Sequence, residues 1–180
     1  VEVVTVAADI VSPEGRARVL EKAEGAEILV TNAGGPPPGL WSDWDREDFI
    51  KALDANMLTP VALMQALLPG MMERGWGRVV NITSRSVKAP ILALGLSNSA
   101  RAGLTGFVAG TSRQVAEKGV TINNLLPGVH ETDRIRQMDA HESTSTGKAL
   151  AEVSAARAAG IPTRHYGQAE DFGRMRAFLC

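Results

Sequence analysis

Three polar side chains that can take part in proton transfer lie close together in the sequence. Ser84 follows an apolar run, Arg78–Ile82, that predicts a buried strand. Ser97 and Arg101 come after a loop, four residues apart in a segment of helical character, so both side chains project from one face of a helix. Two hydroxyls and a permanent cation can hydrogen-bond a substrate oxygen and guide a proton to it. The spacing therefore predicts a polar site between a strand end and a helix.

The elements that would position this site alternate along the chain. The predicted strands are Val3–Ala8, Glu27–Thr31, Arg78–Thr83 and Val120–Leu126. The predicted helices run from a Ser12 cap to Ala23, over Asp45–Asn56, Thr59–Glu73, Ser97–Glu117 and Lys148–Ala158, and from about Gln168 onward. This alternation predicts an α/β fold: a Rossmann-like, doubly wound parallel sheet in three α/β/α layers.

Composition excludes several classes of protein. The 180 residues are 44% hydrophobic and 22% charged, which is typical of one globular domain. A net charge of −1 gives no basic surface for nucleic acid or anionic membrane, and no apolar run reaches the about 18 residues of a membrane span. The single cysteine, Cys180, excludes an internal disulfide and predicts a cytoplasmic protein. The three histidines, His130, His141 and His165, lack metal-ligand spacing, so no metal is expected.

Small or polar residues stand at the ends of all four predicted strands. They are Asp9, Asn32–Gly34, Ser84 and Pro127–Gly128. In doubly wound sheets the ligand binds beyond the carboxyl ends of the strands. Glycines there let the backbone approach a cofactor, and Asp9 can accept a hydrogen bond from an adenine amino group. This edge is therefore the predicted binding site.

In their order along the chain these motifs resemble the short-chain dehydrogenase/reductase family, in particular its 3-oxoacyl-(acyl-carrier-protein) reductase-like branch. In that family a serine precedes a Tyr-x-x-x-Lys helix by thirteen residues. Ser84 fits this spacing when Ser97 stands at the tyrosine position and Arg101 at the lysine position. The other matching segments are Asp9-Ile10, Asn32-Ala33-Gly34, Asn56, Pro127-Gly128-Val129-His130-Glu131-Thr132, and Ile161-Pro162 to Phe178.

The resemblance implies an oxidoreductase that uses NADP or NAD and acts on a small carbonyl or alcohol substrate, such as a 3-oxoacyl compound. The catalytic residues that it implies are Ser84, Asn56, Ser97 and Arg101. The cofactor-binding residues that it implies are Asp9, Ile10, Asn32, Ala33, Gly34, Arg101, Pro127, Gly128, Val129 and Thr132. Family members self-associate, and the apolar faces of the two long helices predict a homodimer or homotetramer; the residues of those faces are Leu63, Met64, Leu67, Leu68, Phe107 and Val108.

Relative to the family, the sequence begins at the third strand. The first two strands, the Gly-rich phosphate loop and the residue that distinguishes NAD from NADP are not in it. We therefore expect residues 1–180 to form a single but partial dinucleotide-binding domain, cut inside a strand at Val1 and inside a helix at Cys180. Residues 129–160, rich in Ser, Thr and Ala, are the expected substrate loop.

The two substitutions leave two functions open. A phenol whose pKa falls from about 10 to about 7 requires about 4 kcal/mol of stabilisation, and a serine hydroxyl is a far weaker acid. Arg101 stays charged and cannot relay a proton as a lysine can. One reading is an oxidoreductase in which water delivers the proton by way of Ser97, Asn56 and Arg101. The other is a non-catalytic nucleotide-binding or scaffold homologue.

Single residues of this set also have local readings. Asp9 can cap the helix near Ser12, and Asn56 can mark a simple break in a helix. Ser84 can be a solvated loop residue, and Arg101 can be a surface cation. The order and spacing of the whole set favour the functional reading over these.

Overall fold

The computed structural model describes residues 2–180, except for the side chain of Arg134. These residues form two compact units. The first contains the chain up to Leu126 together with Leu179 and Cys180, and the second contains Pro127–Phe178. The single partial domain stays a prediction, because a dinucleotide-binding domain can contain more than one compact unit.

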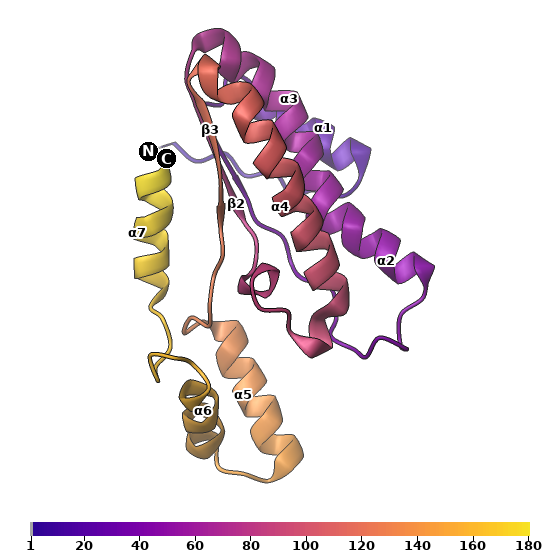
Figure 1. Ribbon diagram of the computed structural model, residues 1–180, viewed down its shortest axis with the longest axis vertical. Helices are drawn as coiled ribbons and strands as arrows, with labels where there is room; N and C mark the ends of the chain where they lie inside the picture. The colour runs from indigo at the N-terminus through magenta and orange to yellow at the C-terminus, as the bar shows by residue number, and fades with distance from the viewer. Residues whose placement is uncertain (1) are drawn as a thin grey trace. The chain divides into compact units, whose positions relative to one another are not determined.

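A three-stranded parallel sheet forms the centre of the first unit. It contains β1 (Ile28–Thr31), β2 (Gly77–Ile82) and β3 (Val120–Leu125) in the order β1-β2-β3 (Figure 1). Both pairings are parallel, and Thr31, Asn81 and Asn124 lie side by side in the register. The prediction of three adjacent parallel strands is therefore confirmed.

The segment Val3–Ala8 was also predicted to be a strand, and this prediction is wrong. The structure assigns it no strand, and the side chains of Val3 and Val4 are exposed. Among the described residues, β1 has a neighbour on one side only, which is β2. The β propensity of a residue reflects mainly how its side chain packs against neighbouring strands. A β-branched run without a partner strand therefore does not form a strand.

The helices of the first unit begin and end where the sequence signals lie. α1 (Pro13–Lys22) starts after Ser12, whose hydroxyl accepts the Gly15 N–H. α2 (Arg46–Leu53), a π-helical segment η1 (Asp54–Leu58) and α3 (Thr59–Arg74) follow one another without interruption. Two 3-10 turns, η2 (Arg85–Val87) and η3 (Leu92–Leu94), precede α4 (Gly95–Val115), and a third, η4 (Ala116–Lys118), comes after it.

No helix in residues 2–180 has the length and apolar character that a membrane span needs.

The hydrophobic core lies between the sheet and the pair α3 and α4, which run side by side over one face of it (Figure 1). Leu29, Val79 and Ile122 form a row across the three strands on this face. Met64 of α3 and Leu104 of α4, both fully buried, pack against the row. Burial of this face fixes the register of the strands, because a slip of one residue would turn the row to the opposite side.

Two residues further along each strand, the same face carries a polar row. Thr31 donates its hydroxyl hydrogen to Asn81 Oδ1 at 2.7 Å, and Asn81 Nδ2 donates to Asn124 Oδ1 at 3.2 Å. Asn81 is fully buried. A buried polar row of this kind is stable only in one register, so it fixes the carboxyl ends of the three strands against one another.

The second unit contains three helices: α5 (Asp133–Thr146), α6 (Leu150–Ala159) and α7 (Ala169–Leu179, which runs one residue into the first unit). α6 and α7 were predicted, but α5 was not, and the expected substrate loop 129–160 is largely helical. The signals for α5 are Thr132 at its N-cap and Gly147, which ends it with a positive φ of 71°. Its polar composition concealed these signals, because it carries no apolar face of helical period.

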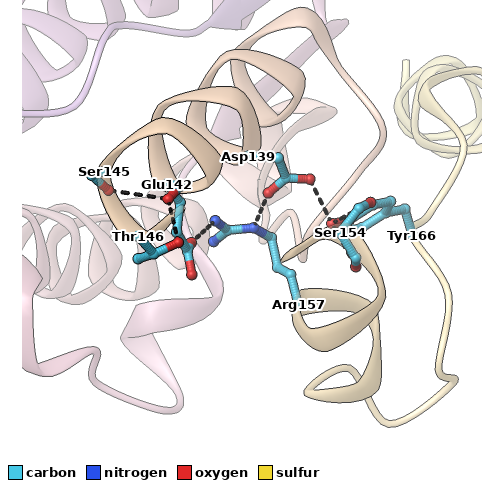
Figure 2. A network of polar contacts seen from close by, with 7 residues as sticks. All are labelled: Asp139, Glu142, Ser145, Thr146, Ser154, Arg157 and Tyr166. Carbon is cyan, nitrogen blue, oxygen red and sulfur yellow. Dashed lines mark hydrogen bonds and ion pairs between the residues drawn. The ribbon is translucent and has the colours of Figure 1, made fainter. Parts of the chain in front are cut away.

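Asp139 is the centre of a polar network in this unit (Figure 2). It is 3% exposed, and its carboxylate accepts hydrogen bonds from Arg157 Nε of α6 and, at 3.0 Å, from the Tyr166 hydroxyl. Arg157 also bonds Glu142 at 2.6 Å. The hydrogen bond to Asp139 raises the pKa of Arg157. The network thus joins α5, α6 and the segment after α6.

Asn81→Leu should destabilise the first unit. It leaves the Thr31 hydroxyl and Asn124 Oδ1 without their partner, and each unsatisfied buried group costs about 1–3 kcal/mol. Urea unfolding should show this loss, whereas Thr121→Val, at an exposed β3 position, should change the free energy of unfolding by less than about 0.5 kcal/mol. Equal effects of both substitutions would mean that the polar row does not stabilise the sheet.

Asp139→Asn should loosen the second unit, because the two hydrogen bonds from Arg157 and Tyr166 go to different carboxylate oxygens and a neutral amide has only one acceptor oxygen. We expect a loss of about 1–3 kcal/mol, the range for hydrogen bonds to a charged group. Faster hydrogen exchange in α5 and α6 would report it. Asp133→Asn removes an exposed partner of Arg136 on the same helix and should leave exchange unchanged. Unchanged exchange in both variants would contradict a stabilising role for the network.

Candidate active site

Arg101 is the best defined of the predicted site residues. It lies in the second turn of α4 and is only 6% exposed, so its reading as a surface cation is wrong. Its Nη1 donates to the Ile82 carbonyl at 2.7 Å and its Nη2 donates to the Ala33 carbonyl at 3.2 Å. Arg101 therefore contacts both the end of β2 and the loop that follows β1.

Burial dominates the electrostatics of Arg101. Among the described residues no carboxylate forms an ion pair with it, and desolvation lowers its pKa from the ordinary value. Two carbonyl dipoles compensate the charge instead of an anion. A buried cation held in this way retains a positive potential for ligands that reach the site.

The two serines precede Arg101 along the chain. Ser84 follows β2 by two residues, is half-buried, and its oxygen accepts the Ser86 N–H at 3.1 Å. That bond leaves the Ser84 hydroxyl hydrogen free to donate elsewhere. Ser97, in the first turn of α4, is 8% exposed, and its hydroxyl has no hydrogen-bond partner within residues 2–180. α4 packs against η2, which begins directly after Ser84.

Asn56 lies in the π-helical segment η1, which packs against α4. It is 1% exposed, and its side-chain oxygen has no hydrogen-bond partner among the described residues. π-Helical turns often occur at functional sites, because they insert an extra residue that redirects side chains. The predicted break at Asn56 is thus a π-turn within a continuous helix.

Unpartnered buried polar atoms gather around these residues. In the described part of the chain they are Asn56 Oδ1, Thr59 Oγ1, Ser86 Oγ, Asn98 Oδ1 and Arg101 Nε. All lie on η1, the start of α3, η2 or α4, the elements that carry or adjoin the predicted catalytic residues. Buried polar groups in folded proteins nearly always have a partner, so these atoms are available for water or a ligand.

Part of the predicted cofactor site lines a cavity. Ile10, Asn32 and Ala33 border a mainly apolar space of about 200 Å³, together with residues of α1, β1, η1 and α3. Gly34 has open space on the side where a Cβ would stand. An apolar cavity bordered by backbone and a few polar groups fits the base and sugar of a nucleotide.

Asp9 has a local role, but it is not the helix cap, which is Ser12. Its carboxylate accepts the Val11 N–H at 3.0 Å, and its carbonyl accepts the Ser12 hydroxyl at 2.8 Å. Asp9 therefore stabilises the turn that leads into α1. Its side chain is exposed, so contact with an adenine stays a prediction.

The remaining predicted cofactor residues belong to the second unit. They are Pro127, Gly128, Val129 and Thr132. Thr132 accepts the Ile135 N–H as the N-cap of α5, and the Val129 carbonyl accepts the Gly167 N–H at 3.0 Å. Their contact with a cofactor stays a prediction.

Asp139, Glu142, Arg157 and Tyr166, the only tyrosine, were not among the sequence candidates. No spacing rule connects these four residues, because the chain turns twice between them. The described residues contain no group of three or more His, Cys, Asp or Glu that could hold a metal ion.

Comparison with known proteins finds a family match over most of the chain. The family described as short chain dehydrogenase matches residues 1–143. The 3-oxoacyl-(acyl-carrier-protein) reductase FabG of Vibrio cholerae is 33% identical over 157 residues, 84% of this chain and 62% of that protein. The acetoacetyl-CoA reductase of Cupriavidus necator is 29% identical over 153 residues, 85% of this chain and 58% of that protein.

Solved structures agree in fold. A variant of actinorhodin polyketide ketoreductase with NADPH superposes with a TM-score of 0.83 and 28% identity, over 96% of this chain and 68% of that one. The L-sorbose reductase of Gluconobacter frateurii gives a TM-score of 0.90 at 23% identity, over 97% and 68%, and shows the fold alone. The chain spans about six tenths of the length of the curated relatives that it matches. On the family match and the parallel sheet together, the chain belongs to the short chain dehydrogenase family.

Proposed function

We propose that the protein is an NADP- or NAD-dependent oxidoreductase that reduces a carbonyl group or oxidises an alcohol where β2 and α4 meet. The observation that carries this proposal is the gathering of unpartnered buried polar atoms on η1, η2 and α4. A purely structural region of this kind would satisfy its polar groups internally.

The cofactor proposal has two supports. The related ketoreductase structure contains NADPH, and Ile10, Asn32 and Ala33 line a cavity suited to part of a nucleotide. On the family resemblance alone, Pro127-Gly128-Val129 and Thr132, which belong to the second unit, are also proposed as cofactor-binding residues. When bound, the nicotinamide would exchange a hydride with the substrate carbon.

The residues of this chain would supply the remaining half of the reaction. The Ser84 hydroxyl, whose oxygen is already oriented by the Ser86 N–H, would donate to the substrate carbonyl oxygen. Reduction of that carbonyl requires one proton for the oxygen. We propose that a water molecule held by Ser97 and Asn56 delivers it, because both have unused hydrogen-bonding capacity in a buried site.

A 3-oxoacyl thioester is the proposed substrate class, since two of the relatives are named as a 3-oxoacyl-(acyl-carrier-protein) reductase and an acetoacetyl-CoA reductase.

Self-association has weaker support than the sequence suggested. Of the six apolar residues expected to form the interface, Leu63, Met64, Leu68 and Val108 are buried within the chain's own core, and only Leu67 and Phe107 are partly exposed. A homodimer or homotetramer, like a cytoplasmic location, stays a prediction.

A non-catalytic nucleotide-binding homologue is the second candidate. It is favoured by Ser97, which cannot replace a phenol as an acid, and by the commitment of the Arg101 guanidinium to backbone carbonyls. The two functions differ in whether restoring a proton donor restores turnover.

Ser97→Tyr combined with Arg101→Lys should raise reductase activity toward a 3-oxoacyl thioester. The phenol and its tuning cation would then be present beside Ser84 and Asn56, and general acid catalysis contributes about 10²–10⁴-fold. The measurement is oxidation of reduced cofactor by the full-length protein, with cofactor affinity determined by calorimetry.

Ser97→Phe combined with Arg101→Lys is the matched control, because it keeps the ring and removes only the hydroxyl. The gain should be absent from it. Tight cofactor binding without any gain from the tyrosine variant would favour the non-catalytic candidate. Absence of both cofactor binding and turnover in every variant would refute the oxidoreductase proposal.

A further inference from the structure

We infer that Arg101 is a positioning residue whose guanidinium holds the cofactor loop after β1 at a fixed distance from the end of β2, in place of the backbone pairing that ends there. We call this arrangement, in which Arg101 bonds both chain segments, the Arg101 clamp. The clamp is independent of the proposed function, and only its effect on cofactor binding rests on that function.

The strand ladder shows where such a clamp is needed. β2 and β3 stay paired to the end, since Ile82 pairs with Leu125 and the Thr83 N–H donates to the Leu125 carbonyl at 2.9 Å. The β1–β2 ladder instead stops at Thr31 and Asn81. Beyond that pair, the described backbone of the loop after β1 forms no hydrogen bond to β2. The two chains separate there.

The Arg101 guanidinium spans this separation. Nη1 bonds the carbonyl of Ile82, the residue after Asn81, and Nη2 bonds the carbonyl of Ala33, the second residue after Thr31. The side chain thus supplies two donors where the ladder would have supplied backbone donors. Ala33 lies within the predicted cofactor loop Asn32–Gly34, and Ile82 lies two residues before Ser84.

An arginine suits this position better than a lysine. Its planar fork presents donors on two separate nitrogens, whereas a lysine presents all of its donors from one atom on a shorter stem. The residue is nearly buried and has no carboxylate partner among the described residues. Because an unpaired buried cation is costly, its two carbonyl bonds must stabilise the site appreciably.

This role differs from that of a proton relay or a tuning cation. A relay must gain and lose a proton, and a guanidinium with two backbone acceptors keeps its protons and its position. Arg101 would then affect binding of the cofactor by setting the loop position, and would affect chemistry only through that geometry.

The first test uses the unmodified full-length protein. Nitrogen-15 NMR of the arginine side chains should show hindered rotation of the Arg101 guanidinium, with separate signals for Nη1 and Nη2. Arg113, exposed on the same helix, should show the averaged signals of a free side chain. Averaged signals from Arg101 would overturn the clamp without any variant being made.

The second test compares Arg101→Ala with Arg113→Ala. Backbone amide signals of Gly34 and Ser84 should shift in the first variant and not in the second. The dissociation constant for NADPH should rise by about tenfold or more, the equivalent of one lost hydrogen bond to a charged group. Millimolar guanidinium chloride should reverse both changes, and urea, which has the same shape but no charge, should not.

The conservative variant Arg101→Lys keeps the charge and removes the fork. Lysine should restore less than half of the NADPH affinity that guanidinium restores to Arg101→Ala. Full recovery by lysine would show that charge alone matters and would contradict the clamp. If the parent protein binds neither NADPH nor NADH but the amide shifts and their rescue occur, the clamp stands and the proposed function fails.

Discussion

The separation of β1 from β2 at their carboxyl ends is the constraint on which the candidate site depends. A doubly wound sheet binds ligands in the crevice beyond the carboxyl ends of its strands, so the loops that leave these ends must be held in place. Parting also removes ladder hydrogen bonds, so the chain must hold its strand ends by other means. Here the row Thr31–Asn81–Asn124 holds them just before the separation, and Arg101 holds them just after it.

The fold was predictable from the sequence wherever burial and local signals agree. The apolar runs of β1, β2 and β3 and the cap at Ser12 lie where the structure has them. Prediction failed where structure depends on a neighbour or lacks an apolar face. Val3–Ala8 has strand composition without a partner, and α5 has good caps without an amphipathic pattern.

The candidate site was predictable as a set of positions but not as a set of contacts. Spacing placed Ser97 and Arg101 on one helix face, and both are buried beside the strand ends. Spacing could not show that Arg101 bonds Ala33 and Ile82, because these partners lie 68 and 19 residues away. The network around Asp139 is hidden for the same reason: its members meet only after the chain has turned back.

The two substitutions at the site are linked by one physical argument. A lysine at position 101 would leave the separated strand ends with a single-atom donor, and an arginine gives them two. An arginine, however, stays protonated and cannot relay a proton as a lysine does, so a tyrosine at position 97 would lose part of its advantage. Once Arg101 is bound to the strand ends, Ser97 in place of a tyrosine removes little further proton-transfer capacity and leaves room for water. Under the proposed function, Ser97 and Arg101 together would exchange proton-transfer capacity for a fixed geometry.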